Sequence, residues 1–197
     1  MAKSADNVES LKIQKGKINI LIIPNEMYSE TLKKIVKNLS DQFEIISYVS
    51  LNKSYPSLMN FLKENGADFE KFIIIDPITK ISELKDINTD QLIHVSSISA
   101  LTELSITINK VLEKTKSEAL IVDSLSTLLI YNDEALITRF VHSLIGKVRA
   151  FGTTAILPIL ARDSKTSLIE DLSMFVDKID DLGKSTSKKE NESEKAK

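Results

Sequence analysis

An aspartate that follows a run of four apolar residues has the clearest chemical potential in this 197-residue sequence. Asp123 ends the apolar run 119–122 and directly precedes Ser124. Together with Thr31, these side chains carry the oxygen atoms needed to hold a hydrated Mg²⁺ or another polar ligand. The same aspartate at a strand end can instead cap the N–H groups of neighbouring loops, and we favour this structural role.

The other titratable residues with catalytic or ligating potential are isolated. Asp76 ends a second apolar run and is followed by Pro77, a pair that is typical of a turn. A two-carboxylate metal site would require Asp76 to converge with Asp123. His94 and His142 lack a ligand spacing such as His-x-x-x-His, so we expect structural or solvated roles for them.

Nucleophilic and thiolate chemistry also lacks support. Ser96, Ser97 and Ser99 are expected in turns and helix caps, because no Gly-x-Ser-x-Gly elbow surrounds them. Cysteine is absent, which excludes disulfides and thiolate metal sites. We therefore expect neither catalytic residues nor a metal site.

Composition and charge narrow the class of protein. The 26 basic and 28 acidic residues give a net charge of -2, which argues against a general nucleic-acid binder. Lys12, Lys15 and Lys17 could contact nucleic acid weakly together with lysines of the C-terminal tail, but we favour a solvated surface. No signal-peptide core or membrane-length apolar run occurs, so we expect a soluble, cytoplasmic protein.

Short β-branched runs alternate with amphipathic stretches along the chain. This alternation predicts an α/β fold with a mainly parallel central sheet, flanked by helices on both faces. Ligands of such sheets bind beyond the carboxyl ends of the strands. Strands are expected at 18–23, 43–49, 71–75, 92–95, 119–122 and 153–160, with a last edge strand at 175–179.

The chain divides into three segments by composition. Residues 1–16 are expected to form an N-terminal extension, and 17–183 a single domain. Residues 184–197 consist mainly of Lys, Ser, Glu and Asn without an apolar anchor, which predicts a disordered charged tail.

Several segments, in order, resemble RecA/KaiC-type ATPases. Residues 118–126 end in Asp-Ser-Leu-Ser and resemble the Walker B strand of that superfamily. A helix that carries Arg139 ends at Gly152 and leads into a threonine-containing strand, as in the family. Residues 175–179 resemble its terminal Val-Asp-x-Ile strand, and 47–51 its second strand. The resemblance implies a RecA-like P-loop NTPase fold over residues 17–183.

The chain departs from this family where the phosphate-binding loop belongs. A phosphate cradle needs glycines and a lysine, but residues 24–31 contain neither. If Thr31 is the family's threonine, Glu30 stands in place of the lysine. Two unit charges about 4 Å apart interact by roughly 4 kcal/mol near a protein surface, so the reversed sign opposes polyphosphate binding.

A second departure concerns hydrolysis. The family's catalytic glutamate would follow Leu51, where this chain has Asn52 and Lys53. Neither residue can act as a carboxylate base. The resemblance thus implies a degenerate nucleotide site and a non-enzymatic pseudo-ATPase, with no cofactor expected and ATP with Mg²⁺ as the open alternative. The degenerate positions are Glu30, Thr31, Asn52, Asp123 and Ser124.

The resemblance leaves three functions open. Because RecA/KaiC-type domains assemble side by side, we expect a regulatory or scaffolding module that works through protein contacts, either in a homo-oligomer or with an active relative. The first alternative is a DNA-recombination accessory protein. The second is a sensor that binds a nucleotide without cleaving it.

Overall fold

The computed structural model describes residues 12–79, 89–164 and 167–183. Within these residues a seven-stranded sheet has the order β4-β3-β2-β5-β6-β1-β7, and every neighbouring pair is parallel. The predicted α/β fold with a parallel sheet is therefore confirmed. The strands are β1 (Ile18–Ile23), β2 (Ile46–Ser50), β3 (Phe72–Asp76), β4 (Leu92–His94), β5 (Ala119–Asp123), β6 (Thr154–Leu160) and β7 (Lys178–Asp181).

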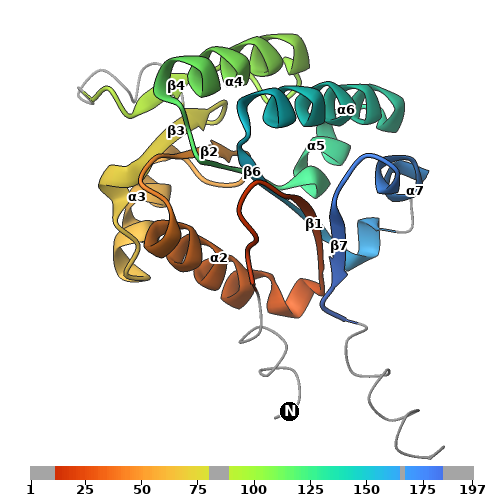
Figure 1. Ribbon diagram of the computed structural model, residues 1–197, viewed down its shortest axis with the longest axis horizontal. Helices are drawn as coiled ribbons and strands as arrows, with labels where there is room; N and C mark the ends of the chain where they lie inside the picture. Colours follow the sequence, from red (N-terminus) through yellow and green to blue (C-terminus); the bar gives the residue numbers. More distant parts are fainter. Residues whose placement is uncertain (1–11, 80–88, 165–166, 184–197) are drawn as a thin grey trace, which may run out of the picture.

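The helices form two layers around the sheet (Figure 1). One layer contains α2 (Tyr28–Gln42) and α3 (Tyr55–Glu64). The other contains α4 (Leu101–Thr115), α5 (Leu125–Tyr131), α6 (Glu134–Phe151) and α7 (Ser167–Ser173). Short 3-10 turns are η1 (Asn25–Met27), η2 (Phe69–Lys71) and η4 (Ala161–Asp163).

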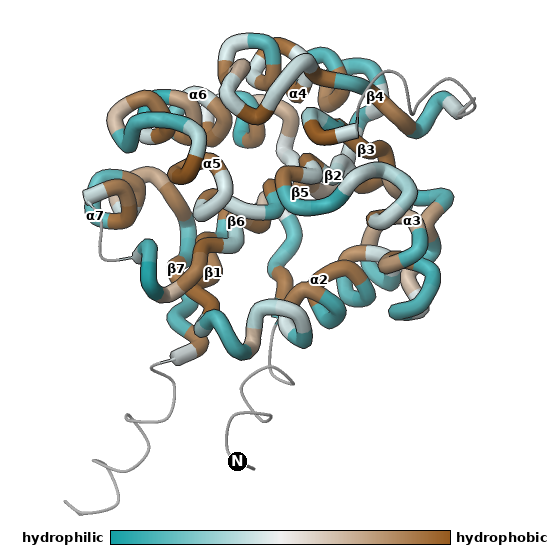
Figure 2. The backbone as a smooth tube through the Cα atoms, turned by 180° about the vertical axis from the view of Figure 1, so that it is seen from behind, coloured by the Kyte–Doolittle hydropathy of each residue, from teal (hydrophilic) through white to brown (hydrophobic). Residues whose placement is uncertain are grey.

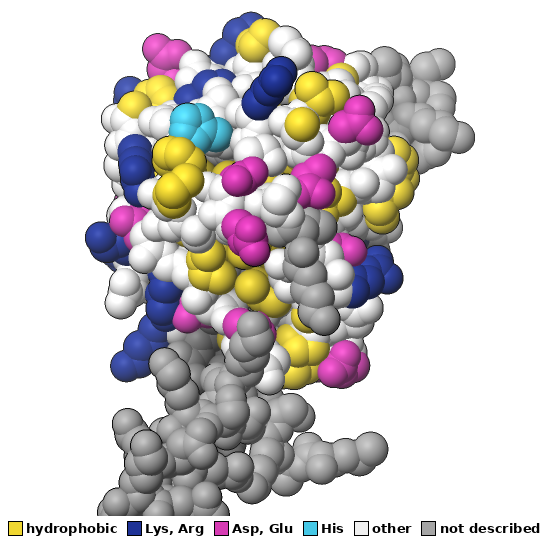
Figure 3. All heavy atoms as spheres, turned by 90° about the vertical axis from the view of Figure 1, so that its right-hand side faces the viewer, with side chains coloured by type: hydrophobic (Ala, Val, Ile, Leu, Met, Phe, Trp, Pro, Cys, Tyr) yellow, Lys and Arg dark blue, Asp and Glu magenta, His cyan; other side chains and the backbone are white. Residues whose placement is uncertain are grey.

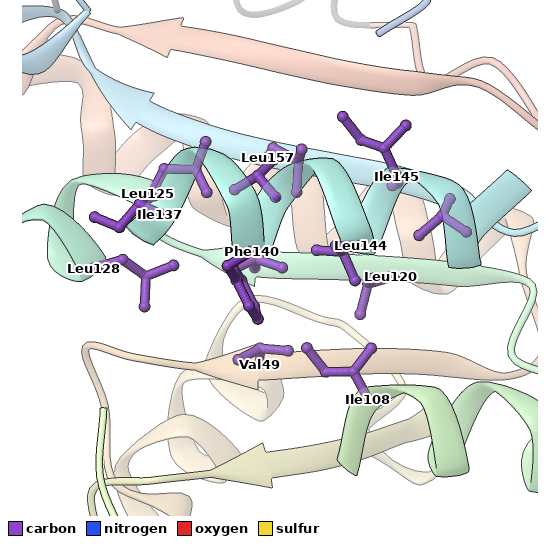
Figure 4. Close-up of a cluster of buried hydrophobic side chains, with 14 of the residues drawn as sticks. Val49, Ile108, Leu120, Leu125, Leu128, Ile137, Phe140, Leu144, Ile145 and Leu157 are labelled. Atoms are coloured by element: carbon purple, nitrogen blue, oxygen red, sulfur yellow. The ribbon is translucent and has the colours of Figure 1, made fainter. Parts of the chain in front are cut away.

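The central strands are buried on both faces, which explains their continuous apolar sequences. All residues of β1, β2 and β5 are buried. Phe140 and Leu144 of α6 lie over Val49 and Leu120 of the sheet (Figure 4). Figure 2 shows the same arrangement, with hydrophobic strands in the interior and hydrophilic stretches concentrated in outer turns and helix faces. The packing fixes the sheet's carboxyl edge as a rigid platform.

Two of the predicted strands were misplaced. β2 begins at Ile46 and not at Phe43, because Phe43 ends α2 with its N–H bonded to the carbonyl of Leu39. The last strand spans 178–181 and not 175–179, because the N–H groups of 175 and 176 close a turn after α7.

Other predictions fall outside the described residues. These are the charged tail 184–197 and most of the extension 1–16. In the part of the chain that the structure describes, no helix has both the length and the hydrophobicity needed to cross a membrane.

Candidate functional site

The carboxylate of Asp123 lies at the centre of a buried polar cluster at the end of β5. Its side chain has no solvent exposure. The hydroxyl of Tyr28 and the amide of Asn52 donate to Oδ1, the latter at 3.0 Å. The hydroxyl of Tyr48 donates to Oδ2 at 2.5 Å, and Nζ of Lys53 lies 4.0 Å from that oxygen. Three hydrogen bonds and one cation therefore surround this carboxylate.

The sheet topology brings these groups together from distant parts of the sequence. β2 and β5 are neighbours with Ser50 opposite Asp123, so the residues after β2 pass beside the aspartate. The N–H of Leu51 bonds to the carbonyl of Asp123 at 2.9 Å, which fixes that passage. A single 3-10 turn separates β1 from α2 and places Tyr28 at the first helical position.

Burial determines the protonation state of the two phenols. It raises the pKa of Tyr28 and of Tyr48 well above the ordinary value, and the nearby Asp123 carboxylate raises it further. Both hydroxyls therefore stay protonated and act as donors. Lys53 supplies the positive charge facing the carboxylate, and its ammonium lies 4.9 Å from the ring centroid of Phe61.

A second layer of hydroxyls holds the cluster in place. Thr127 donates to the side-chain oxygen of Asn52, and its hydroxyl lies 3.2 Å from that of Ser124. Ser126 accepts the N–H of Leu160 at 2.8 Å and so ties α5 to the end of β6. The peptide between residues 123 and 124 is cis. The hydroxyls of the Asp-Ser-Leu-Ser stretch thus bond within the protein.

The structure unites three of the five positions inferred from the resemblance. Asn52, Asp123 and Ser124 belong to the cluster. Glu30 points away and pairs on the surface with Lys33 at 2.6 Å. Thr31 is buried, and its hydroxyl has no hydrogen-bond partner among the described residues.

The hypothesis that Thr31, Asp123 and Ser124 jointly hold Mg²⁺ therefore gains no support. No hydrogen bond links Thr31 to the other two residues within the described ranges. In those ranges no group of three His, Cys, Asp or Glu side chains has a metal-binding arrangement. The carboxylate of Asp123 instead accepts hydrogen bonds from two hydroxyls and an amide and faces an ammonium group.

Sequence reasoning missed the roles of Tyr28 and Tyr48. Tyr28 lies in the segment 24–31 and Tyr48 in the segment 47–51, and neither pattern indicates a partner for the hydroxyl. A tyrosine within a wholly buried strand requires a partner for its hydroxyl, and this was the available signal for Tyr48. The partner itself, 75 residues away, could not be identified from spacing.

Asp76 forms a separate structural centre. Its carboxylate accepts the N–H groups of Tyr55 at 2.8 Å, Ile78 at 2.7 Å and Thr79 at 2.9 Å, and the hydroxyl of Thr79. The predicted turn is confirmed, and the same side chain also caps the first residue of α3.

The remaining candidates have local contacts. His142 packs edge-on against Phe175 with ring centroids 4.3 Å apart. His94 lies at the end of β4, and its Nδ1 is buried without a hydrogen-bond partner in the described residues. Nζ of Lys15 lies 5.1 Å from the ring centroid of Phe43.

The three candidate serines and Lys17 also have partners. Ser96 donates to the carboxylate of Glu103, and Ser97 and Ser99 bond to each other, as expected for turn residues. The expected capping role is wrong, because the N-cap of α4 is Ala100 and no side chain caps it. Lys17 pairs with Asp177 at 3.5 Å.

The parallel sheet and the aspartate at the end of β5 agree with a comparison against known families. A family model described as the KaiC ATPase matches residues 33–179, more than half of the chain. The chain belongs to the KaiC ATPase family. The RecA/KaiC resemblance is thereby confirmed.

A solved structure supports the same fold. The KaiC-like protein from the hyperthermophilic archaeon Pyrococcus horikoshii OT3 superposes with a TM-score of 0.56 at 16% sequence identity. The match covers 76% of this chain and 63% of that one, so this chain spans less than two thirds of its relative. No curated protein matches the sequence. At this identity the likeness describes the fold alone.

The KaiC match begins at Lys33, just after the segment where the phosphate loop would lie. That segment folds as η1 and the first turn of α2, with the N–H of Met27 bonded to the carbonyl of Pro24 at 2.9 Å. The hydroxyl of Tyr28 reaches Asp123 from this turn.

Proposed function

We propose that this KaiC-family domain is a non-catalytic module that acts through contacts with other protein chains, as a regulator or scaffold. The observation that carries the proposal is the saturated environment of Asp123. Its two oxygens accept hydrogen bonds from Tyr28, Asn52 and Tyr48, and the ammonium of Lys53 faces them.

Nucleotide binding would require this cluster to open. A metal–nucleotide complex needs carboxylate lone pairs that face a ligand, whereas here phenols and an amide occupy them. A hydrogen bond to a charged group contributes about 1.5–3 kcal/mol, so the loss of several is a large penalty. The segment 24–31 offers neither glycine nor lysine in compensation.

Hydrolysis would further require a base that orients water. The residues after β2 are Asn52 and Lys53, and both side chains are directed at Asp123. An amide cannot accept the proton of an attacking water, and an ammonium has no lone pair to do so. The identity of these two residues supports a role without nucleotide hydrolysis.

The proposal is tested by calorimetric titration of the chain with ATP and Mg²⁺, together with a phosphate-release assay. We expect no binding heat and no release above the buffer background. A ligand at 100 times its Kd stabilises a protein by about 2.7 kcal/mol. A parallel thermal melt would therefore also reveal binding that releases no heat. Phosphate release that disappears in Asp123→Asn would refute the proposal.

These experiments, together with a DNA-binding assay, separate the two alternatives. Binding heat without phosphate release would assign a nucleotide sensor. A salt-dependent shift of single-stranded DNA would assign a DNA accessory role, which the balanced charge of the chain does not favour.

A further inference from the structure

A groove of about 840 Å³ lies between α4 and the outer strands β3 and β4. Ile73 of β3, Ile93 of β4 and Ile45 before β2 line it, and each of these side chains is only half-buried. Ile75, which lies two residues beyond Ile73 on the same face of β3, is fully buried. Among the described residues, the sheet under this groove is therefore covered only in part.

This apolar strip lies at the end of a helical layer. α4 packs against α6, and α6 packs against α7. At the opposite edge of the sheet the layer ends with α7 near β7 (Figure 1), and Figure 3 shows acidic and hydrophobic side chains interspersed on that side. Helices bury the apolar face of a sheet by packing side by side on it. The groove beside α4 thus has the position of one further helix in this layer.

Two lysines make one wall of the groove positive. Lys110 and Lys114 of α4 line it, are exposed and are four residues apart, so they share one side of the helix. Within the described residues neither takes part in an ion pair. Glu44 and Lys71, which also line the groove, differ because they pair with each other at 3.1 Å.

Two carboxylates mark the end of the groove at the amino edge of the sheet. Glu70 comes just before β3 and Asp90 just before β4, and both are exposed without an ion pair in the described ranges. Nε2 of Gln91 donates to the carbonyl of Phe69 at 3.2 Å and to that of Glu70 at 2.8 Å, which ties the two approaches together. The groove thus combines an apolar floor, a positive wall and a negative end.

We propose that this groove binds an amphipathic helix of a different, partner protein. The apolar face of the partner helix packs on Ile73 and Ile93. Its acidic flank faces Lys110 and Lys114, and a basic end faces the two carboxylates at the amino edge. The inference rests on the proposed function and specifies the contact surface and the chemistry of the partner.

The spacing of the charges favours a helix as the occupant. Residues four apart on a helix are about 6 Å apart along its axis. Acidic residues four apart on a helix that lies alongside α4 therefore match Lys110 and Lys114. Strand addition at the free edge of β4 is disfavoured, because β4 has only three residues, Leu92–His94, and offers few main-chain hydrogen bonds.

Peptide binding with a charge exchange tests the proposal. The probe is a synthetic helix of 15 residues, the length of α4, with leucines along one face and glutamates four residues apart on one flank. A second peptide has lysines in place of these glutamates. Fluorescence anisotropy should show that the wild type binds the glutamate peptide about tenfold more tightly, and that Lys110→Glu/Lys114→Glu reverses this preference. Such a reversal requires a folded variant. The glutamate peptide should also shift the methyl NMR signals of Ile73 and Ile93.

Two controls test the site and the shape of the occupant. Lys33→Glu/Lys37→Glu makes the same change at the same spacing on α2, in the opposite layer, and should keep the preference of the wild type. A glutamate peptide with a central proline cannot form the helix and should not bind. Equal binding of the proline peptide, as expected for strand addition at β4, would overturn the proposal. No binding to the wild type, or the same preference in the wild type and Lys110→Glu/Lys114→Glu, would overturn it as well.

The outcome for the proposed function is distinguishable from this test. ATP hydrolysis would refute the non-catalytic role whatever the peptides do. Failure of the peptide test without ATP binding would leave a non-catalytic module that uses another contact surface.

Discussion

The protein's own side chains surround the carboxylate of Asp123. A strand-end aspartate is compatible with both a metal ligand and a structural acceptor. Two tyrosine hydroxyls and one amide make it an acceptor here. Tyr28 comes from the segment where the family resemblance would put a phosphate loop, and its hydroxyl donates to the carboxylate.

Tyr48→Phe removes one donor from the buried carboxylate without changing the shape of the side chain. We expect a loss of about 1–3 kcal/mol in the free energy of unfolding, because a buried acceptor is left unsatisfied. Urea unfolding measures the change. Tyr131→Phe is the matched control, because Tyr131 is 55% exposed and its variant should unfold like the wild type. Equal stability of all three proteins would contradict the account of the cluster.

Asp177 gives a prediction for acid stability. The N–H of Ile18 donates to its carboxylate at 2.9 Å and, with Lys17 and Arg149 nearby, holds the pKa of Asp177 below the ordinary range. Its contribution is fully present above the unfolded-state pKa of about 3.9, and it is lost as pH falls through the lower folded-state pKa. In Asp177→Asn the stability should therefore fall less between neutral and acidic pH, as measured by urea midpoints across that range. If the urea midpoint of Asp177→Asn falls toward acidic pH as steeply as that of the wild type, Asp177 does not have this role.

At the scale of elements, the local sequence predicts where a strand lies better than it predicts the residue at which the strand begins or ends. Continuous β-branched runs predicted β1, β3 and β5 because strands buried on both faces need no polar alternation. The terminal strand was misplaced because Phe175 and Val176 are as apolar as strand residues but close a turn. The tyrosine pair was not predicted, since its contacts join residues 95 and 75 positions apart.

Asp76 shows how one side chain can hold two elements together. Asp76→Ala would leave the N–H groups of Tyr55, Ile78 and Thr79 without their acceptor, and we expect a loss of at least about 2 kcal/mol in the free energy of unfolding. Chemical denaturation measures this loss. Asp68→Ala is the control, because Asp68 accepts a single, exposed N–H at 3.2 Å and its loss should cost about 1 kcal/mol or less. A larger loss in the free energy of unfolding for Asp68→Ala than for Asp76→Ala would contradict the role of Asp76 in holding the two elements together.

At the scale of the whole molecule, the sheet and its two helical layers match a KaiC ATPase domain, and at its carboxyl edge the protein's own side chains surround Asp123. Lys53 supplies the positive charge that faces Asp123. We therefore expect chelation of divalent cations with EDTA to leave the melting temperature unchanged. A drop on chelation that Mg²⁺ restores would indicate a bound metal and contradict this view.

The hydroxyl proton of Tyr28 tests the central claim most directly. A buried phenol that donates to a carboxylate exchanges slowly with water, so its proton should be visible by NMR and absent in Tyr28→Phe. The account predicts that this signal keeps its position and intensity when ATP and Mg²⁺ are added in excess. Loss or displacement of the signal on addition of the nucleotide, with Tyr28 leaving Asp123, would contradict it.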